Sequence, residues 1–230
     1  MNPLPVGGAK TALVREMFER IAPRYDRMNR VVSLGLDQRW RRAAIAAIGV
    51  GPGDLVVDLA CGTGDLAELA VRAGARVVAL DSARAMLRGA RGRGVGAALG
   101  LSDASQLPLR SACASAVTCG FALRNFSAPD PVLREAARVL APGGRLALLE
   151  VGVPESALAR AGHRLWFERV VPFVGGLLAD REAYRYLPRS VAYLPSELAL
   201  GRMLRAAGFA SVARTPFLFG AAQLFTAVRA

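Results

Sequence analysis

The segment that most constrains the fold reads VVDLACGTGD and runs from Val56 to Asp65. Its β-branched start predicts a buried strand. The two glycines that follow predict a tight turn into a helix that begins at Asp65. A strand, a glycine turn and a helix in this order are typical of nucleotide-binding α/β folds. The segment therefore predicts a parallel sheet with a ligand site at its turn.

The alternation of strand and helix continues along the chain, which predicts βαβ units. We expect strands at 55–60, 76–81, 97–101, 115–119 and 145–151, helices at 65–73, 83–91 and 131–140, and a turn at 141–144. A helix is expected at 196–207, capped by Ser196 and stopped by Gly208. Apolar strands at 212–217 and 223–228 then predict an antiparallel hairpin.

Two regions break this alternation. Residues 1–49 have a helical apolar pattern, with one helix ending before Pro23 and another between Asp37 and Gly49. Residues 154–194 form a helical, aromatic-rich insert between the last parallel strand and the C-terminal hairpin.

Composition excludes several classes of protein. Apolar residues make up 53% of the 230 residues, yet no run reaches the roughly 18 to 20 that a membrane span needs. The N-terminus lacks the pattern of a signal peptide, so we expect a soluble, cytoplasmic protein. Cys61, Cys113 and Cys119 form no CxxC pair, and His163 is the only histidine, so neither a metal site nor a disulfide is expected.

The net charge is +12, and Lys10 is the only lysine. A coding bias toward arginine explains part of this charge, and attraction to an anionic surface is the functional alternative. No basic run is interleaved with aromatic residues as in single-strand binders, so nucleic acid is not the expected partner. Peripheral contact with an anionic membrane is the favoured functional reading.

The acids around the glycine turn select between nucleotide ligands. Gly62, Gly64 and Ala67 match the dinucleotide spacing G-x-G-x-x-G/A, which alone is a weak signal. Asp58 and Asp65 flank the turn, and their carboxylates would repel a pyrophosphate. S-adenosylmethionine has no phosphate and carries a cationic sulfonium and ammonium. The acids therefore favour S-adenosylmethionine, with dinucleotide binding as a distant alternative.

Further acids follow the next two strands. Asp81 can accept both ribose hydroxyls, a role that would serve NAD equally, and Asp103 can accept the adenine amino group beside the backbone N–H of Ala104. The competing interpretation is that each acid merely caps its following helix. Acids at three successive strand ends indicate a methyltransferase, and the predicted cofactor-binding residues are Asp58, Gly62, Thr63, Gly64, Asp81, Ser82, Asp103, Ala104 and Gly120.

These residues resemble a class I S-adenosylmethionine-dependent methyltransferase. Nearly the whole chain resembles the ubiquinone/menaquinone biosynthesis C-methyltransferases through segments in the same order: FERIAPRYDRMNRVVSLGLDQRWRR (18–42), FALRNF (121–126), RVLAPGGRLALLEV (138–151), EAYRYLPRSVAYLPS (182–196) and LRAAGF (204–209). The resemblance implies a Rossmann-like α/β fold with a mostly parallel seven-stranded sheet and a C-terminal antiparallel hairpin. It also implies an N-terminal helical lid (1–49) on a methyltransferase domain (50–230) whose insert (154–194) serves the acceptor.

The family methylates a ring carbon of a polyprenylated quinol, and the favoured acceptor is demethylmenaquinol. Loss of a phenolic proton makes the neighbouring carbon nucleophilic, so such an enzyme needs alignment of the reactants and a means to stabilise a phenolate. Arg124 is expected to supply positive charge and Asn125 a hydrogen bond to a ring oxygen, while Tyr25 and Asp26 come from the lid. The second-tier candidates are Tyr184, Tyr186 and Arg189.

Each assignment has a structural alternative. Arg124 can serve only as the partner of a sheet-edge acid, Asn125 as a turn cap, and Tyr25 with Asp26 as a corner between helices. Cys61 is expected to pack under the glycine turn, and His163 to lie on the surface. The insert's apolar residues either pack in a core or form a channel for a prenyl tail beside the bilayer: Trp166, Phe167, Val170, Val171 and Phe173.

The sequence departs from the family pattern at 110–117, at Ala122 and in the last strand. These departures leave two alternatives open beside quinol methylation: a methyltransferase for another phenolic or isoprenoid molecule, and a non-catalytic accessory protein of quinone synthesis. Formation of a homodimer is also left open.

Overall fold

The computed structural model describes residues 5–154, 156, 160–162, 165, 186 and 189–230. The predicted insert at 154–194 therefore lies largely outside the described residues, as do His163, Tyr184 and the insert's aromatic residues. The structure has a single seven-stranded sheet in the order β3-β2-β1-β4-β5-β7-β6.

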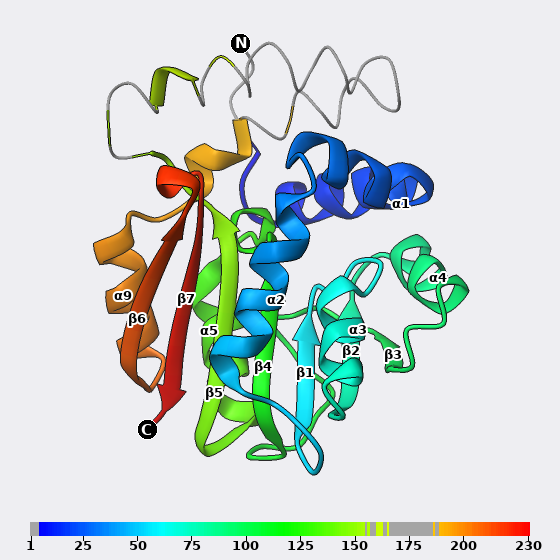
Figure 1. Ribbon diagram of the computed structural model, residues 1–230, viewed down its shortest axis with the longest axis vertical. Helices are drawn as coiled ribbons and strands as arrows, with labels where there is room; N and C mark the ends of the chain where they lie inside the picture. The colour runs from blue at the N-terminus through cyan, green and yellow to red at the C-terminus, as the bar shows by residue number, and fades with distance from the viewer. Residues whose placement is uncertain (1–4, 155, 157–159, 163–164, 166–185, 187–188) are drawn as a thin grey trace.

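The sheet confirms the predicted fold class. Strands β1 to β5 are parallel, and β7 runs antiparallel to both β5 and β6 (Figure 1). The strands are β1 (Leu55–Leu59), β2 (Arg76–Asp81), β3 (Ala98–Leu101), β4 (Ala114–Gly120), β5 (Leu140–Val151), β6 (Phe209–Phe217) and β7 (Ala222–Arg229).

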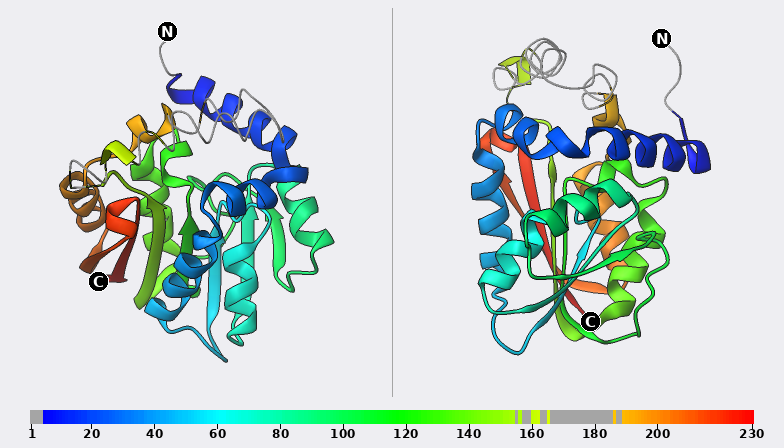
Figure 2. Two further views of the ribbon diagram at one scale, coloured as in Figure 1. Left: turned by 45° about the horizontal axis from the view of Figure 1, so that its top comes forward. Right: turned by 90° about the vertical axis from the view of Figure 1, so that its right-hand side faces the viewer.

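Helices cover both faces of the sheet, as βαβ connections require. Helices α2 (Leu36–Ile48), α3 (Asp65–Arg72) and α4 (Arg84–Gly92) lie on one face, and α5 (Pro129–Val139) and α9 (Glu197–Ala206) lie on the other (Figure 2). Successive strand side chains point to opposite faces. Val56 packs in the core beneath α2 and α3, whereas Val57 and Leu59 pack in the core beneath α5 and α9.

The N-terminal helix α1 (Gly7–Val32) lies across the carboxyl ends of the parallel strands (Figure 2). Its apolar stripe, which includes Val14, Met17 and Ile21, packs against Met86 of α4 and against Tyr186. This stripe holds α1 over the edge of the sheet where a βαβ fold places its ligand.

Two local predictions were wrong. Helix α1 runs through Pro23 instead of ending before it, because the proline ring is exposed while the buried residues Ile21 and Met28 hold both sides of the helix against the domain. The turn expected at 141–144 lies inside β5, where the register with β4 shifts between Ala114 and Ala116. The Ser196 cap and the stop at Gly208 are confirmed.

Within the described part of the chain, no helix is both long enough and apolar enough to span a bilayer.

Candidate active site

Two cavities meet beneath α1 at the carboxyl edge of the sheet. The small cavity, of about 100 Å³, lies over the ends of β1, β2 and β4, and the large cavity, of about 380 Å³, lies among α1, α2, the end of β5 and the β6–β7 turn. Phe18, Tyr25, Phe121 and Asn125 line both cavities. The two cavities therefore adjoin at these four side chains.

The small cavity collects most of the predicted cofactor residues. They arrive from the ends of neighbouring strands, as expected for a parallel sheet. The predicted residues on its wall are Tyr25, Gly62, Asp81, Ser82, Asp103, Ala104, Gly120 and Asn125, whereas Asp26, Asp58, Thr63 and Gly64 line neither cavity.

The glycine turn takes a backbone shape that other residues disfavour. Gly62 has φ 57° and Gly64 has φ 88°. A Cβ on Gly64 would lie 3.0 Å from Val95, so this glycine lets the turn pack closely against the chain after α4. A Cβ on Gly62 would lie 3.7 Å from the Tyr25 ring, which places the lid aromatic directly over the turn.

Asp81 connects the glycine turn to the end of β2. One carboxylate oxygen accepts the Gly62 N–H at 2.8 Å, and the other accepts the Ala83 N–H at 2.8 Å. Burial raises the pKa of Asp81, although these backbone donors oppose the rise. Asp103 accepts from the backbone and the hydroxyl of Ser105, at 2.8 and 2.7 Å.

Asp58 lies beneath the turn rather than on the cavity wall. Its two carboxylate oxygens accept the Thr118 hydroxyl at 2.7 Å and the Ala67 N–H of α3 at 3.1 Å. Burial raises its pKa to about 7. Asp58 therefore ties β1 to β4 and to the start of α3, and its effect on a ligand would pass through the shape of the turn.

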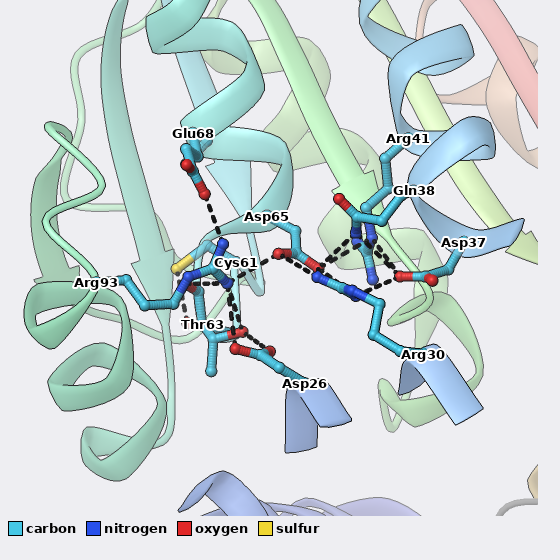
Figure 3. A network of polar contacts seen from close by, with 12 residues as sticks. Asp26, Arg30, Asp37, Gln38, Arg41, Cys61, Thr63, Asp65, Glu68 and Arg93 are labelled. Atoms are coloured by element: carbon cyan, nitrogen blue, oxygen red, sulfur yellow. Dashed lines mark hydrogen bonds and ion pairs between the residues drawn. The ribbon is translucent and has the colours of Figure 1, made fainter. Parts of the chain in front are cut away.

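Asp65 is the centre of an ion-pair network that joins the lid to the domain (Figure 3). Its carboxylate lies 3.1 Å from Arg30, 3.3 Å from Arg41 and 2.8 Å from Arg93. Although burial raises the pKa of Asp65, the charge of Arg41 and the hydrogen bonds of Arg30 and Arg93 outweigh it and lower the pKa to about 2. The acid that favoured a cationic ligand is thus paired with arginines of this chain.

Asp26 and Thr63 belong to the same network (Figure 3). The Thr63 hydroxyl donates to the Asp26 carboxylate, and Arg93 lies 3.2 Å from that carboxylate. Both residues were predicted to act on ligands, but the structure brings them into contact with each other between α1 and the glycine turn. Asp26 lies within the continuous helix α1, so its observed contact is with the glycine turn and not with a corner between helices.

Arg124 is buried on the wall of the large cavity, in the short helix η1 (Leu123–Asn125). Its Nη1 donates to Glu150 at 2.5 Å and to the Phe121 carbonyl at 2.6 Å, and its Nε donates to Ser190 at 3.2 Å. The partner Glu150 is a fully buried residue of the interior strand β5 rather than a sheet-edge acid. Among the described residues, no hydrogen-bond partner is found for Nη2 of Arg124.

Asn125 is held where the two cavities meet. Its side-chain oxygen accepts the Tyr186 hydroxyl at 3.3 Å, and its nitrogen donates to the Phe121 carbonyl at 3.5 Å. Desolvation raises the pKa of Tyr186 to about 12 and also raises the pKa of Tyr25, against the opposing charge of Arg41. Both hydroxyls therefore stay protonated at neutral pH and are hydrogen-bond donors.

Three important residues were missed from the sequence. Glu150 fixes Arg124, and Arg41 lines the large cavity while it pairs with Asp65. Lys10 is 3% exposed, donates to the Phe126 carbonyl at 2.7 Å and lies 3.5 Å from the centroid of the Tyr193 ring. The sequence offered no clear signal for them, because all three contacts join residues far apart in sequence.

Comparison with known proteins identifies the family. Residues 6–229 match the model of the ubiE/COQ5 methyltransferase family. The chain belongs to this family. It is 46% identical over 216 residues to the demethylmenaquinone methyltransferase of Thermus thermophilus, which covers 90% of this chain and 97% of the relative. It is 45% identical to the enzyme of the same name from Deinococcus radiodurans, covering 90% of each chain.

Solved structures agree on the fold. The magnesium protoporphyrin IX methyltransferase of Synechocystis, solved with bound S-adenosylhomocysteine, matches with a TM-score of 0.66 at 22% identity, over 95% of this chain and 99% of the other. The family and the fold confirm the prediction of an S-adenosylmethionine-dependent methyltransferase.

Proposed function

We propose that this methyltransferase transfers a methyl group from S-adenosylmethionine to a ring carbon of a polyprenylated quinol, with demethylmenaquinol as the acceptor. The observation that carries the proposal is the meeting of two unlike cavities at Phe18, Tyr25, Phe121 and Asn125. One cavity has acids and a bare glycine turn, and the other is mostly apolar. The curated relatives named demethylmenaquinone methyltransferase support the choice of acceptor.

The small cavity has the groups that S-adenosylmethionine needs. Asp81 and Asp103 offer acceptors for the ribose and the adenine amino group, and Leu80, Met86 and Val132 offer apolar contacts for a base. Gly62 and Gly120 allow close approach of a ligand to the backbone. The cofactor supplies an electrophilic methyl group on a sulfonium. We propose that Asp58, Thr63 and Gly64 support this site through the shape of the turn.

In the large cavity, Arg124 is the proposed stabiliser of the phenolate. Glu150, Ser190 and the Phe121 carbonyl bind its Nε and Nη1 and so fix the guanidinium, and Arg124 lines the cavity. We propose that Nη2 donates to the acceptor oxygen. A preorganised donor of this kind stabilises developing negative charge more than water does. We propose that Asn125 and the protonated Tyr25 hydroxyl, which line the large cavity, orient the ring oxygens, and that Asp26 keeps the lid aligned.

The departures from the family pattern bear unequally on this proposal. Residues 110–117 line neither cavity, whereas Ala122 lines the small one. Ala122 therefore bears on the cofactor side, and a changed acceptor would be traced to the start of the last strand, where Ala221, just before β7, lines the large cavity.

We also propose that the protein acts in the cytoplasm at the inner face of the membrane, where a prenylated acceptor resides. The net charge of +12 and the apolar cavity support contact with anionic lipid. A homodimer is not part of the proposal. Nucleic acid has no part in the proposal.

A methyl-transfer assay tests the proposed function. Purified protein and S-adenosylmethionine are incubated with reduced demethylmenaquinone or with the demethylated benzoquinol, and the quinone mass is followed. We expect a gain of one methyl group on the naphthoquinol. Transfer to neither acceptor, with S-adenosylmethionine still bound in calorimetry, would contradict the acceptor and leave the cofactor site standing.

A further inference from the structure

Three exposed apolar residues share an unfavourable backbone shape. Leu34, Leu218 and Phe219 are 70%, 52% and 82% exposed, with φ angles of 53°, 45° and 55°. The left-handed region is disfavoured for side chains with a Cβ, and asparagine and glycine adopt it most readily. At each position the backbone is strained and apolar surface is exposed to water. Both features lower the stability of the folded protein in water.

The three residues surround the same opening. Leu34 lies in the turn between α1 and α2, and Leu218 and Phe219 lie in η4 (Leu218–Gly220), the turn between β6 and β7. All three line the large cavity, so two segments far apart in sequence present apolar side chains at one opening. Both turns lie at the α1 end of the molecule (Figure 1). We call these three residues the docking rim.

The helices on either side of Leu34 expose basic side chains. From residue 20 to residue 47, which spans the second half of α1 and nearly all of α2, every exposed charged side chain is an arginine: Arg20, Arg24, Arg27, Arg39 and Arg42. The two acids of this stretch, Asp26 and Asp37, are at least partly buried in ion pairs. Apolar tips flanked by cations are suited to an anionic bilayer, whose headgroups attract arginine and whose acyl chains accept Leu and Phe.

We propose that the docking rim inserts into the surface of an anionic bilayer and opens the large cavity directly to the membrane. This inference deepens the proposed function and rests on it for the prenylated acceptor. The acceptor's ring would enter the apolar cavity while its tail remained in lipid, so the substrate would never cross water. Binding to the bilayer itself requires no acceptor and is measured separately.

The test is binding of the full-length protein to vesicles made of equal parts phosphatidylcholine and phosphatidylglycerol. The variant carries Leu34→Asn and Phe219→Asn, since asparagine tolerates the left-handed conformation and does not insert into lipid. The control is Leu198→Asn, because Leu198 is 80% exposed on α9 and lines neither cavity. The melting temperature and the oligomeric state of each protein are also measured without vesicles, by thermal unfolding and by sedimentation.

We expect the double variant to bind these vesicles at least about tenfold more weakly, and the control to bind like the unmodified protein. The melting temperature of the double variant should equal or exceed that of the unmodified protein, because strain has been removed. Equal binding by both variants would overturn the proposal. So would a shift from dimer to monomer with unchanged vesicle binding, which would assign the rim to a second copy.

The experiments distinguish an error in the proposed docking surface from an error in the proposed function. If the protein binds vesicles through the rim but methylates neither quinol, the acceptor is wrong and the docking surface stands. If it methylates the quinol and the double variant binds vesicles normally, the function stands and the docking surface is wrong.

Discussion

The two cavities differ in how the chain closes them. The small cavity lies beside a dense ion-pair network that clamps α1 to the glycine turn through Asp65 and its arginines (Figure 3). The large cavity opens between strained apolar side chains at the docking rim. A charged, water-soluble cofactor and a hydrophobic acceptor would thus enter through two openings that differ in their residues. The difference teaches that α1 borders both cavities in two ways. Its ion pairs hold the glycine turn beside the small cavity and extend to Asp37 and Arg41 in the wall of the large one, whereas apolar side chains surround the opening of the large cavity.

The size of the small cavity adds a mechanical consequence. At about 100 Å³ it is well below the roughly 300–1,000 Å³ of usual small-molecule pockets. We therefore expect the small cavity to widen when a cofactor binds, with a shift of α1, which covers it. Asp65 is nearly buried while Arg30 and Arg93 are partly exposed, so salt should screen these ion pairs only in part.

The largest expected effect concerns the large cavity. Arg124→Lys retains a positive charge for Glu150 but loses the planar guanidinium. The variant therefore has no second nitrogen, equivalent to Nη2, to donate a hydrogen bond to the acceptor. We expect turnover to fall by about 100-fold in the methyl-transfer assay, with little change in S-adenosylmethionine affinity. Arg145→Lys, which alters a partly exposed pair with Asp54, is the matched control. Turnover within threefold of the unmodified protein would refute the role of Arg124.

The next effect concerns the clamp on the small cavity. Asp65→Asn leaves Arg30, Arg41 and Arg93 crowded without their shared anion. We expect the free energy of unfolding to fall by about 2–4 kcal/mol in urea titrations, with faster dissociation of the cofactor. Glu16→Gln, at an exposed pair with Arg20, should change stability by less than about 0.5 kcal/mol. Equal stability of both variants would show that the clamp is not stabilising.

The same clamp sets a pH dependence. The pKa of Asp65 is about 2 in the folded protein and about 3.9 in an unfolded chain. Because the folded pKa is the lower one, its stabilisation is complete above about pH 4 and is lost as the pH falls toward 2. The stability difference between the unmodified protein and Asp65→Asn should therefore be constant near neutrality and shrink below pH 4. A difference that already shrinks near pH 6 would contradict this assignment.

The smallest effect lies where the cavities meet. Tyr186→Phe removes one hydrogen bond to Asn125 at 3.3 Å and preserves the ring. A bond of this kind contributes about 0.5–1.5 kcal/mol, so kcat/KM for the acceptor should fall by roughly two- to tenfold. Cofactor affinity should not change, which calorimetry checks. An equal loss on the cofactor side would show that Tyr186 stabilises the lid rather than Asn125.

Local patterns predicted the fold well and the polar contacts poorly. The strand that contains Val56 and Val57, and the cap at Ser196, follow from periodicity and from near neighbours in sequence, so they were predictable. Helix α1 continues through Pro23 because tertiary packing on either side outweighs one missing hydrogen bond.

In the candidate site, too, the sequence predicted positions better than polar contacts. Acids at strand ends correctly predicted where the small cavity lies, since parallel strands end at one edge. The sequence did not reveal that Asp65 is paired with three arginines, or that Glu150 holds Arg124, because these partners are separated by 24 to 35 residues and meet only in the folded chain. Charge partners at long range are a property of the packed structure and not of a local pattern.

Lys10 gives the lid a chemical reporter. It is the only lysine of the chain, and α1 buries its amine against Phe126 and Tyr193. An amine-reactive reagent can modify this side chain only during the intervals when the start of α1 lifts away. The rate of labelling at this position, followed by mass spectrometry, would therefore report any opening of α1, and we expect a bound cofactor that holds the helix down to protect the one lysine from reaction.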